Sequence, residues 1–367
     1  MKRSQNNKLS VCVVCGGVSP EHTISVASAS SVFNNLDREK YNVLSIGINK
    51  KTGEWMYYGD KTFYTETGSI DSFKLKDDDW YPCHIKPGKK PCLYFNDRNG
   101  EQEINVDIFF PVIHGDNCED GKFQGLLESL NYPLVGCGTL ASAVGMDKDL
   151  TKIIAEKMSI QVVPWIYINN KKEINIEDIS SKIGFPCFVK PTASGSSCGI
   201  RKVKKQEDLL DSINHAFDFS DSVIIEQAIN AREIEVAVLG KWNGKVKVSV
   251  AGEIIPKNEF YDYDAKYIDK DGATLAIPAK ISEDILATVQ SYASKIFKAL
   301  RCSGMSRVDF FIDKDTGKVF FNEVNTIPGF TVISMYPKLF AYIGVDYVEL
   351  LDELIKIGLE GNKNDRE

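Results

Sequence analysis

The segment RVDFFIDKDTGKVFFNEVN, residues 307–325, has the pattern of an antiparallel β-hairpin. Two runs of alternating apolar residues flank a turn at residues 314–317 that contains Asp and Gly. Residues two apart on a strand share a face, so Glu323 and Asn325 lie on one side, where Asp309 of the first strand can join them. Three oxygen ligands suit Mg2+, which prefers hard oxygen donors, and nothing in the segment suits Zn2+. The sequence therefore predicts a hairpin that carries a magnesium site.

The alternative for these three side chains is that they are solvated polar residues on the outer face of the hairpin. Arg307 lies two residues before Asp309, and a glycine-containing segment follows Asn325. These neighbours favour the metal site over the alternative.

The composition is that of a soluble globular protein. The 367 residues predict two or three domains, at roughly 150 residues per domain. No apolar run approaches the roughly 20 residues that span a bilayer. The net charge of −7 gives no overall positive field, so we expect no binding to nucleic acid or to a membrane. The nine cysteines are odd in number and follow no disulfide spacing, and the polar start lacks a cleavage signal, so we expect a cytoplasmic protein with reduced cysteines.

The N-terminal region has the pattern of a βαβ unit that opens a doubly wound domain. Val11 to Cys15 is a buried strand, a helix starts near His22, and Val43 to Ile48 is a second strand. Cys12 and Cys15 form a C-x-x-C inside the first strand, where an extended backbone directs them to opposite faces. We interpret both as buried packing residues.

An insertion over residues 55–100, to which we assign short strands, precedes the next strand, Val106 to Ile113. A helix from Lys122 to Leu130 follows. Ligands bind at the carboxyl ends of the strands in open α/β sheets. We therefore expect the loops Gly16 to Glu21 and His114 to Gly121 to lie side by side.

Small residues at Gly136 to Thr139 follow a complete α/β unit and indicate a domain boundary. We predict an α/β protein with an N-terminal doubly wound, Rossmann-like domain over residues 1–138. Two further units follow, over residues 139–228 and 229–360. The tyrosine- and aspartate-rich stretch 256–272 has the length of an active-site lid.

Gly195-Ser196-Ser197, after a predicted strand that contains Lys190, has the small side chains of a phosphate-binding turn. The segment matches neither of the usual mononucleotide and dinucleotide glycine motifs. Without Lys190 a plain surface turn would be the better interpretation. Lys148, in turn, has as its alternative an ordinary exposed helix lysine.

Together these features resemble the D-alanine:D-alanine ligases, members of the ATP-grasp superfamily, along nearly the whole chain. The motifs that carry the resemblance are GGVSPE (16–21), HG (114–115), EDG (119–121), QG (124–125), MDK (146–148), GSS (195–197), YDAKY (263–267), RVD (307–309), NEVN (322–325) and PG (328–329). The resemblance implies a two-part ATP-grasp fold after the N-terminal domain. It also implies ATP-dependent ligation of two D-alanine molecules. The dipeptide would be used in peptidoglycan synthesis, on which the cell wall and the cell shape depend.

The resemblance implies an ATP site between the two ATP-grasp units. Residues 226–229 would hold the adenine, Glu233 the ribose, and Lys148 and Lys190 the phosphates. The full set of implied ATP contacts is Lys148, Lys190, Glu226, Gln227, Ala228, Ile229, Glu233, Lys266 and Asn322. The implied metal ligands are Asp309, Glu323 and Asn325, which would hold two Mg2+ ions, for which Mn2+ can substitute.

The resemblance also implies the reaction. The carboxylate of one D-alanine would take the γ-phosphoryl group to give an acyl phosphate, and the amine of a second D-alanine would displace the phosphate. The implied roles in this chemistry are Glu21 for the first ammonium group, His114 near it, Ser196 as the link from Glu21 to the lid residue Tyr267, Arg307 and the Gly329 amide for the oxyanion, and Ser334 with Lys266 for the second carboxylate.

Acceptor choice depends on the lid, where this chain keeps Tyr267, and on the segment that follows residues 328–329 and contains Met335. Related ligases that use D-lactate or D-serine tend to carry Arg at that position, so Met335 favours D-alanine. Cys118 departs from the family, which usually has Gly there, and we expect it to require a different backbone conformation in a tight loop.

Three alternatives remain: a D-serine or D-lactate acceptor, a non-catalytic ATP-binding regulatory protein, and an ATP-grasp ligase for another carboxylate and amine. The resemblance further implies a homodimer formed through the N-terminal domain.

Overall fold

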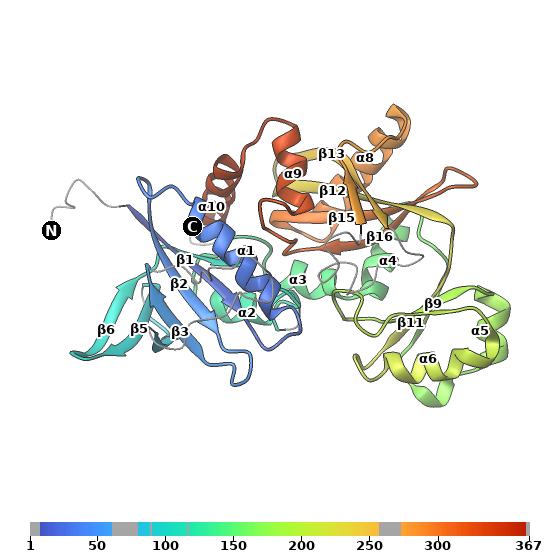
Figure 1. The fold of residues 1–367 in the computed structure, drawn as a ribbon, viewed down its shortest axis with the longest axis horizontal. Coiled ribbons are helices and arrows are strands. Elements are labelled where there is room, and N and C mark those ends of the chain that lie inside the picture. The colour runs from blue at the N-terminus through green and yellow to red at the C-terminus, as the bar shows by residue number, and fades with distance from the viewer. Residues whose placement is uncertain (1–7, 61–79, 89, 116, 257–272, 365–367) are drawn as a thin grey trace.

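The computed structural model describes residues 8–60, 80–88, 90–115, 117–256 and 273–364. The predicted lid, with Lys266 and Tyr267, lies almost entirely outside the described residues. In the described part the chain forms three β-sheets with helices packed against them (Figure 1). Within that part, no helix is long and apolar enough to cross a membrane.

The first sheet has seven strands and confirms the predicted βαβ start. In spatial order its strands are β6 (Gly100–Asn105), β5 (Cys92–Asp97), β4 (Tyr81–Ile85), β3 (Trp55–Gly59), β2 (Tyr41–Ile48), β1 (Leu9–Gly16) and β7 (Ile108–Pro111). β1 pairs in parallel with β2 and β7, and α1 (His22–Asn35) connects β1 to β2. The insertion supplies β3 to β5, and β6 follows directly after it; these four strands extend the sheet by antiparallel pairing.

Two details of this sheet bear on the sequence predictions. Cys12 and Cys15 are fully buried in different cores, as expected from their opposite faces. β7 is shorter than predicted, since Val106 donates its amide to the Pro91 carbonyl at 3.0 Å instead of joining β1. The helix after β7 is α2 (Lys122–Ser129), as predicted.

The second sheet is small and entirely antiparallel. Its order is β10 (Arg201–Val203), β9 (Cys187–Pro191), β11 (Val223–Gln227) and β8 (Trp165–Ile168). The helices α5 (Ile176–Ile183) and α6 (Leu209–Ala216) cover one face of it, where they form a separate apolar core with β9 and β11 (Figure 1). Short 3-10 turns lie at Lys171–Glu173 and Gln206–Asp208.

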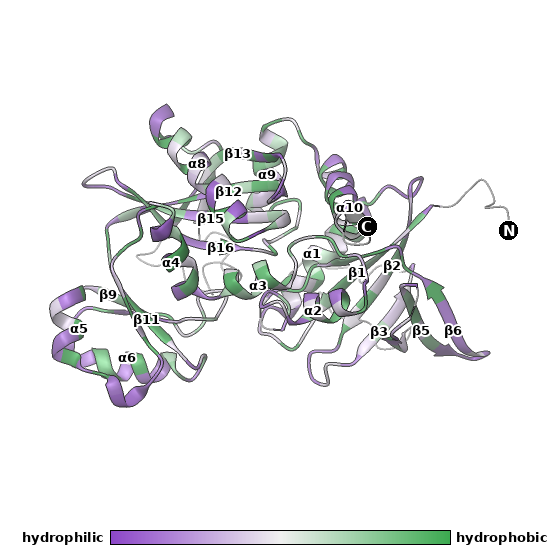
Figure 2. Cartoon of the chain, turned by 180° about the vertical axis from the view of Figure 1, so that it is seen from behind, coloured by the Kyte–Doolittle hydropathy of each residue, from purple (hydrophilic) through white to green (hydrophobic). Residues whose placement is uncertain are grey.

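The third sheet contains the predicted hairpin. Its order is β14 (Ala273–Ala276), β13 (Val246–Pro256), β12 (Ala231–Lys241), β15 (Ser303–Asp313) and β16 (Val319–Asn325). One core joins this sheet to α8 (Glu283–Ala299), α3 (Thr139–Met146) and α4 (Lys148–Lys157). Figure 2 shows α3 as largely hydrophobic, which fits its contacts with α2 and β16.

The other face of the third sheet carries α9 (Met335–Tyr342) and α10 (Tyr347–Asn364). Here one apolar core runs from β1 and α1 through α10 and α9 to β12 (Figure 1). α10 extends further than the predicted 346–357, and residues beyond Gly358 stay helical instead of fraying. The first and third sheets are therefore joined by packing and not only by the connecting chain.

The hairpin itself is confirmed, with one addition. Asp313 forms the turn, because its Oδ1 accepts the amides of Asp315 at 2.9 Å and Thr316 at 2.7 Å. Asp309 lies opposite Glu323, but the next pair is Phe310 with Phe321, so Asn322 has no partner in the register. This β-bulge bends the strand beside the predicted metal ligands, where such bulges commonly re-aim side chains.

Candidate active site

The charged cluster on the hairpin is held together by Arg307. Its Nε and Nη2 donate to the two oxygens of Asp309 at 2.8 and 2.7 Å. Asn325 Nδ2 donates to Asp309 Oδ2 at 2.9 Å, and Glu235 Oε2 lies 3.2 Å from Arg307 Nε. Burial opposes the charge of Arg307, but Asp309 and Glu235 outweigh it and raise the pKa of the guanidinium well above its usual value. Arg307 is thus a fixed cation beside the predicted metal ligands.

The donor set at this place fits Mg2+. Asp309 and Glu323 face each other across the hairpin and Asn325 supplies an amide oxygen, so every side-chain donor is a hard oxygen. In the described part of the chain no group of three or more His, Cys, Asp or Glu residues is arranged to hold a metal. Two carboxylates are nevertheless what magnesium sites for substrate phosphates commonly use.

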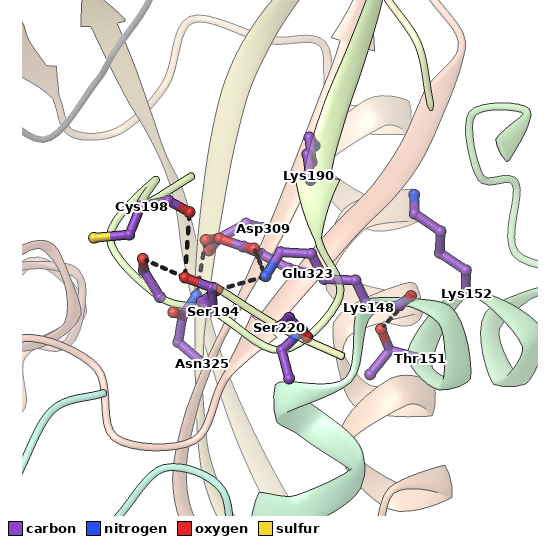
Figure 3. Close-up of polar contacts among 12 residues, drawn as sticks. Lys148, Thr151, Lys152, Lys190, Ser194, Cys198, Ser220, Asp309, Glu323 and Asn325 are labelled. Atoms are coloured by element: carbon purple, nitrogen blue, oxygen red, sulfur yellow. Dashed lines mark hydrogen bonds and ion pairs between the residues drawn. The ribbon is translucent and has the colours of Figure 1, made fainter. Parts of the chain in front are cut away.

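Lys148 lies inside the site, so the alternative of an exposed helix lysine is wrong. It is the first residue of α4, after Asp147, whose Oδ1 caps the helix by accepting the Leu150 amide at 2.9 Å. Its side chain is buried, its Nζ donates to the Ser194 carbonyl at 2.7 Å, and Glu323 Oε2 lies at 3.8 Å. Figure 3 shows Lys148 pointing toward Ser194 and Glu323.

Lys190 lies beside a lysine that the sequence interpretation missed. Glu226 on β11 forms ion pairs with Lys190 Nζ at 2.5 Å and with Lys152 Nζ at 2.7 Å. Burial alone would raise the pKa of Glu226, but the two ammonium groups lower it to about 2. The signal for Lys152 was present in its spacing, because Lys152 follows Lys148 by four residues and so shares its helix face.

The Gly195-Ser196-Ser197 loop connects this part of the molecule to the N-terminal domain. Ser196 and Ser197 are both left-handed, with φ of 50° and 59°. Ser196 Oγ donates to the Glu21 carboxylate, and a Cβ atom at Gly195 would lie 3.0 Å from Glu21 Oε2. The loop therefore makes the expected contact with Glu21, while the expected onward link to Tyr267 lies outside the described residues.

The two loops predicted to be adjacent are in contact. Ser19 Oγ donates to the His114 carbonyl at 2.8 Å, and a Cβ atom at Gly115 would lie 2.5 Å from Glu21 Oε2. Glu119 Oε2 accepts the Gly115 amide at 2.8 Å. Burial first, and then the nearby Glu21 carboxylate, raise the pKa of Glu119. Two carboxyl groups therefore lie together where the first ammonium group is expected.

The His114 ring is engaged by the protein at both nitrogens. Nε2 pairs with Ser28 Oγ at 3.1 Å and Nδ1 with the Ile327 carbonyl at 3.1 Å. The Phe330 amide donates to Ser28 Oγ at 3.3 Å. His114 and Ser28 thus tie the segment around Gly329 to α1.

The Gly329 to Met335 segment forms a compact turn. Ser334 Oγ accepts the Thr331 amide at 3.1 Å, and a Cβ atom at Gly329 would lie 3.2 Å from Ser334 Oγ. The Met335 side chain is buried, and a Cβ atom at Gly252 would lie 2.5 Å from its sulfur. The structure thus places Ser334 beside Gly329 and the Met335 sulfur against β13.

The expectation for Cys118 concerns the backbone at that position, which is not left-handed. Cys118 is buried in an apolar core and is not among the residues with positive φ. Its neighbour Asn117 takes the left-handed conformation instead, with φ of 68°. The left-handed position of the loop is thus occupied by Asn, which tolerates that conformation far better than most side chains.

The implied adenine residues lie at the end of β11. The Gln227 amide donates to the Pro164 carbonyl at 3.0 Å and the Ala228 amide to the Pro186 carbonyl at 3.1 Å. Ile229 follows in the connection to β12, on which Glu233 lies opposite Phe311 of β15.

A cavity brings together residues from four of the sequence motifs, those at 119–121, 146–148, 195–197 and 322–325. It is lined by Glu119, Gly145, Met146, Lys148, Ser194, Gly195, Ser196, Ser197, Ile200, Glu323, Val324, Asn325 and Thr326. The N-terminal loop, the start of α4, the serine loop and the hairpin thus share one space. Its lining combines the cation Lys148, two glutamates and small polar groups, a mixture that can bind phosphates through metal ions and the lysine.

The chain is similar to known proteins over nearly its whole length. The family model described as the D-ala D-ala ligase N-terminus matches residues 10–137, and the one described as the D-ala D-ala ligase C-terminus matches residues 154–356. The chain is 47% identical to the D-alanine--D-alanine ligase of Caldicellulosiruptor bescii, an alignment that covers 97% of this chain and 96% of that one. It is 44% identical to the corresponding protein of Clostridium novyi, over 96% and 98% of the two chains.

Two solved structures are similar over nearly their whole length. The D-alanine-D-alanine ligase from Coxiella burnetii has a TM-score of 0.83 at 35% identity, covering 98% of this chain and 96% of that one. The VanG D-Ala:D-Ser ligase from Enterococcus faecalis has a TM-score of 0.81 at 35% identity, covering 96% and 100%.

Proposed function

The chain belongs to the D-alanine–D-alanine ligase family, and on that premise we propose that it joins two D-alanine molecules in an ATP-dependent reaction that supplies peptidoglycan synthesis. The observation that carries the proposal is the shared cavity, in which Lys148 and the serine loop face Glu323 and Asn325. Glu21 reaches the same loop from the N-terminal domain through Ser196. The residues proposed to bind ATP and those proposed to bind D-alanine therefore lie next to each other.

For ATP, we assign Lys148 and Lys190 to the phosphates, residues 226–229 to the adenine and Glu233 to the ribose. Asn322 is added because it lies in the bulge next to Glu323. Asp309, Glu323 and Asn325 would hold two Mg2+ ions, or Mn2+ in their place, and bound metal neutralises charge on the transferred phosphoryl group. The oxygen-only donor set supports this assignment.

For the chemistry, Glu21 binds the ammonium group of the first D-alanine and leaves its carboxylate free to attack the γ-phosphate. An acyl phosphate and ADP form. The second D-alanine amine attacks the acyl carbon, the tetrahedral intermediate expels inorganic phosphate, and the amine releases a proton to solvent. Arg307 and the Gly329 amide donate to the oxyanion, since preorganised donors aimed at developing charge contribute strongly to catalysis.

The remaining assignments concern the acceptor and the lid. Ser334 and Lys266 would receive the second carboxylate, and Tyr267 would close the site through Ser196. The His114 ring contacts the Ile327 carbonyl and so fixes the segment that carries the oxyanion donor Gly329. Closure excludes water that would otherwise hydrolyse the acyl phosphate.

D-Alanine is the proposed acceptor. Met335 offers no hydrogen-bond donor to the hydroxyl group of D-lactate or D-serine, and its side chain fills space beside Gly252. D-Serine is the second candidate, because the similar VanG structure is named a D-Ala:D-Ser ligase.

The domain division at 139 and 229 and the homodimer remain part of the proposal. Each of the three sheets falls within one of the proposed units. Light scattering of the purified protein would test the dimer.

The function is tested by ADP release with magnesium-ATP and D-alanine, with the dipeptide identified and D-serine and D-lactate offered in competition. D-Alanyl-D-alanine as the main product supports the proposal. If the main product contains D-serine or D-lactate, the acceptor assignment is overturned. ATP binding without any turnover favours a regulatory protein.

A further inference from the structure

Lys152 is a lysine whose side chain is completely enclosed. Its exposed fraction is 0%, and its Nζ lies 2.7 Å from Glu226 Oε1. The Trp165 ring lies beside it, with its centroid 5.9 Å from Lys152 Nζ, and Trp165 is itself fixed by donating to Asp149 Oδ1 at 2.7 Å. Figure 3 shows Lys152 on the same helix as Lys148, with Lys190 on the neighbouring strand. Lysines are almost never fully buried unless they are paired.

The charges in this group are unequal. Glu226 carries one negative charge, and the ammonium groups of Lys152 and Lys190 both lie on it, one on each carboxylate oxygen. Glu226 is itself 2% exposed, so solvent cannot replace either partner. Removing one partner of a buried charge pair leaves the other charge uncompensated, which is strongly unfavourable.

This excess of positive charge has a consequence for nucleotide binding. If Lys190 is to bind a phosphate, its ammonium group has to share or leave Glu226. With Lys152 in place, Glu226 keeps a partner during that movement. Without Lys152, Lys190 would remain bound to Glu226 as a neutral ion pair, and its ammonium group would not be available to bind the phosphates.

We propose that Lys152 is a positioning residue of the nucleotide site, whose ammonium group stays on Glu226 and so allows Lys190 to turn to a nucleotide phosphate. The inference rests on the proposed function only in taking Lys190 as a phosphate ligand. Lys152 touches neither the phosphates nor the reacting atoms and acts through Glu226.

The test is the dissociation constant of ATP, measured by calorimetry on the full chain without D-alanine. In Lys152→Met we expect ATP binding to weaken at least about tenfold, because breaking a buried charge pair has effects of that order or more. We then compare the double variant, Lys152→Met with Glu226→Gln, with Glu226→Gln alone. We expect these two proteins to bind ATP with nearly the same affinity, because no buried anion remains to hold Lys190. Lys182→Met is the matched control, since Lys182 is 61% exposed and pairs with Asp178 on the surface, and its ATP affinity should equal that of the wild type.

The unfolding midpoint of every variant separates a structural role from the proposed one. A folded Lys152→Met protein with unchanged ATP affinity and only a lower midpoint overturns the proposal. If Lys152→Met does not fold, the comparison of Glu226→Gln with the double variant decides: equal ATP affinities support the proposal, and a further loss in the double variant overturns it. Dipeptide formation is measured separately, so a wild type that binds ATP but makes no dipeptide removes the proposed function without affecting this inference.

Discussion

His114 is neutral in the folded protein because its ring is buried and both nitrogens are used. Burial lowers its pKa to about 4, against a usual value near 6.5. Nδ1 then donates to the Ile327 carbonyl and Nε2 accepts from Ser28, an arrangement that only the neutral ring can make. The contacts in the folded protein therefore favour the neutral His114 ring.

This charge state predicts a pH dependence of stability. Between about pH 6.5 and about pH 4 the unfolded chain binds a proton at His114 that the folded protein does not, so the free energy of unfolding falls as the pH is lowered, by up to about 3 kcal/mol from this residue. We expect His114→Gln to be less stable near neutral pH and to lose less stability on acidification. Urea unfolding of both proteins at about pH 7 and about pH 4.5 measures the difference. An equal loss in both would contradict the assignment.

Cys118 makes a second prediction at this scale. Its side chain is buried in an apolar core and its backbone is not left-handed, so Cys118→Gly removes packing and adds chain entropy without relieving strain. We expect a loss of stability of about 1 kcal/mol and unchanged ATP affinity. Asn117→Gly is the matched control, because Asn117 holds the left-handed position, and its stability should change by less than about 0.5 kcal/mol. Stabilisation by Cys118→Gly would show that the cysteine is strained after all.

At the scale of one element, α4 organises the cation side of the site. Its first residue is Lys148, and Lys152 follows one turn later on the same face. The position of both depends on how the helix starts, and Asp147 fixes that start by accepting the Leu150 amide. The motif residues at 146–148 thus combine a cap with a binding residue.

Removing the cap should therefore affect stability and nucleotide affinity together. Asp147→Ala should cost about 1 kcal/mol of stability, because the first turn loses its side-chain acceptor. We also expect a higher KM for ATP, since Lys148 lies in the turn that frays. Asp147→Asn retains an acceptor oxygen and should behave nearly as the wild type in urea unfolding and in the ATP titration. A similar loss in both variants would point to the charge of Asp147 instead of the cap.

At the scale of the whole molecule, α10 and α9 join the N-terminal sheet to the sheet that carries the hairpin. One core includes residues of β1, α1, α10 and β12. One close approach is at Gly358 of α10, where a Cβ atom would lie 2.6 Å from the Leu134 carbonyl and 2.7 Å from Ile108 Cδ1. At this position α10 therefore packs directly against the N-terminal domain.

Gly358→Ala should destabilise the protein, although alanine is the better helix former by about 1 kcal/mol. The added methyl group meets backbone that cannot move aside, so α10 has to shift from the N-terminal sheet. Gly361→Ala, on the same helix, is the matched control, because its nearest neighbour is the flexible end of Lys241 at 3.9 Å, and it should be neutral or stabilising. Thermal unfolding of the two variants gives the comparison, and a more stable Gly358→Ala would contradict the packing argument.

The local elements followed from the sequence because their signals are local. Alternation and an Asp-Gly turn predicted the hairpin of β15 and β16, and apolar runs with glycine turns predicted the start of the first sheet. The resemblance to the ligase family, carried by short motifs in a fixed order, identified the family. Each of these features depends on residues close to one another in the chain.

Other features depended on the tertiary structure. The bulge at Asn322, the burial of Lys148 and Lys152, and the engagement of both His114 nitrogens arise from contacts between segments far apart in sequence. A strand or helix pattern shows that a lysine lies on a given face, but not whether another sheet covers that face or which carboxylate lies opposite. The sequence by itself determined the elements and the family, and the packing of three sheets decided which side chains are buried and with what partner, because desolvation and pairing are set by the surroundings and not by the chain alone.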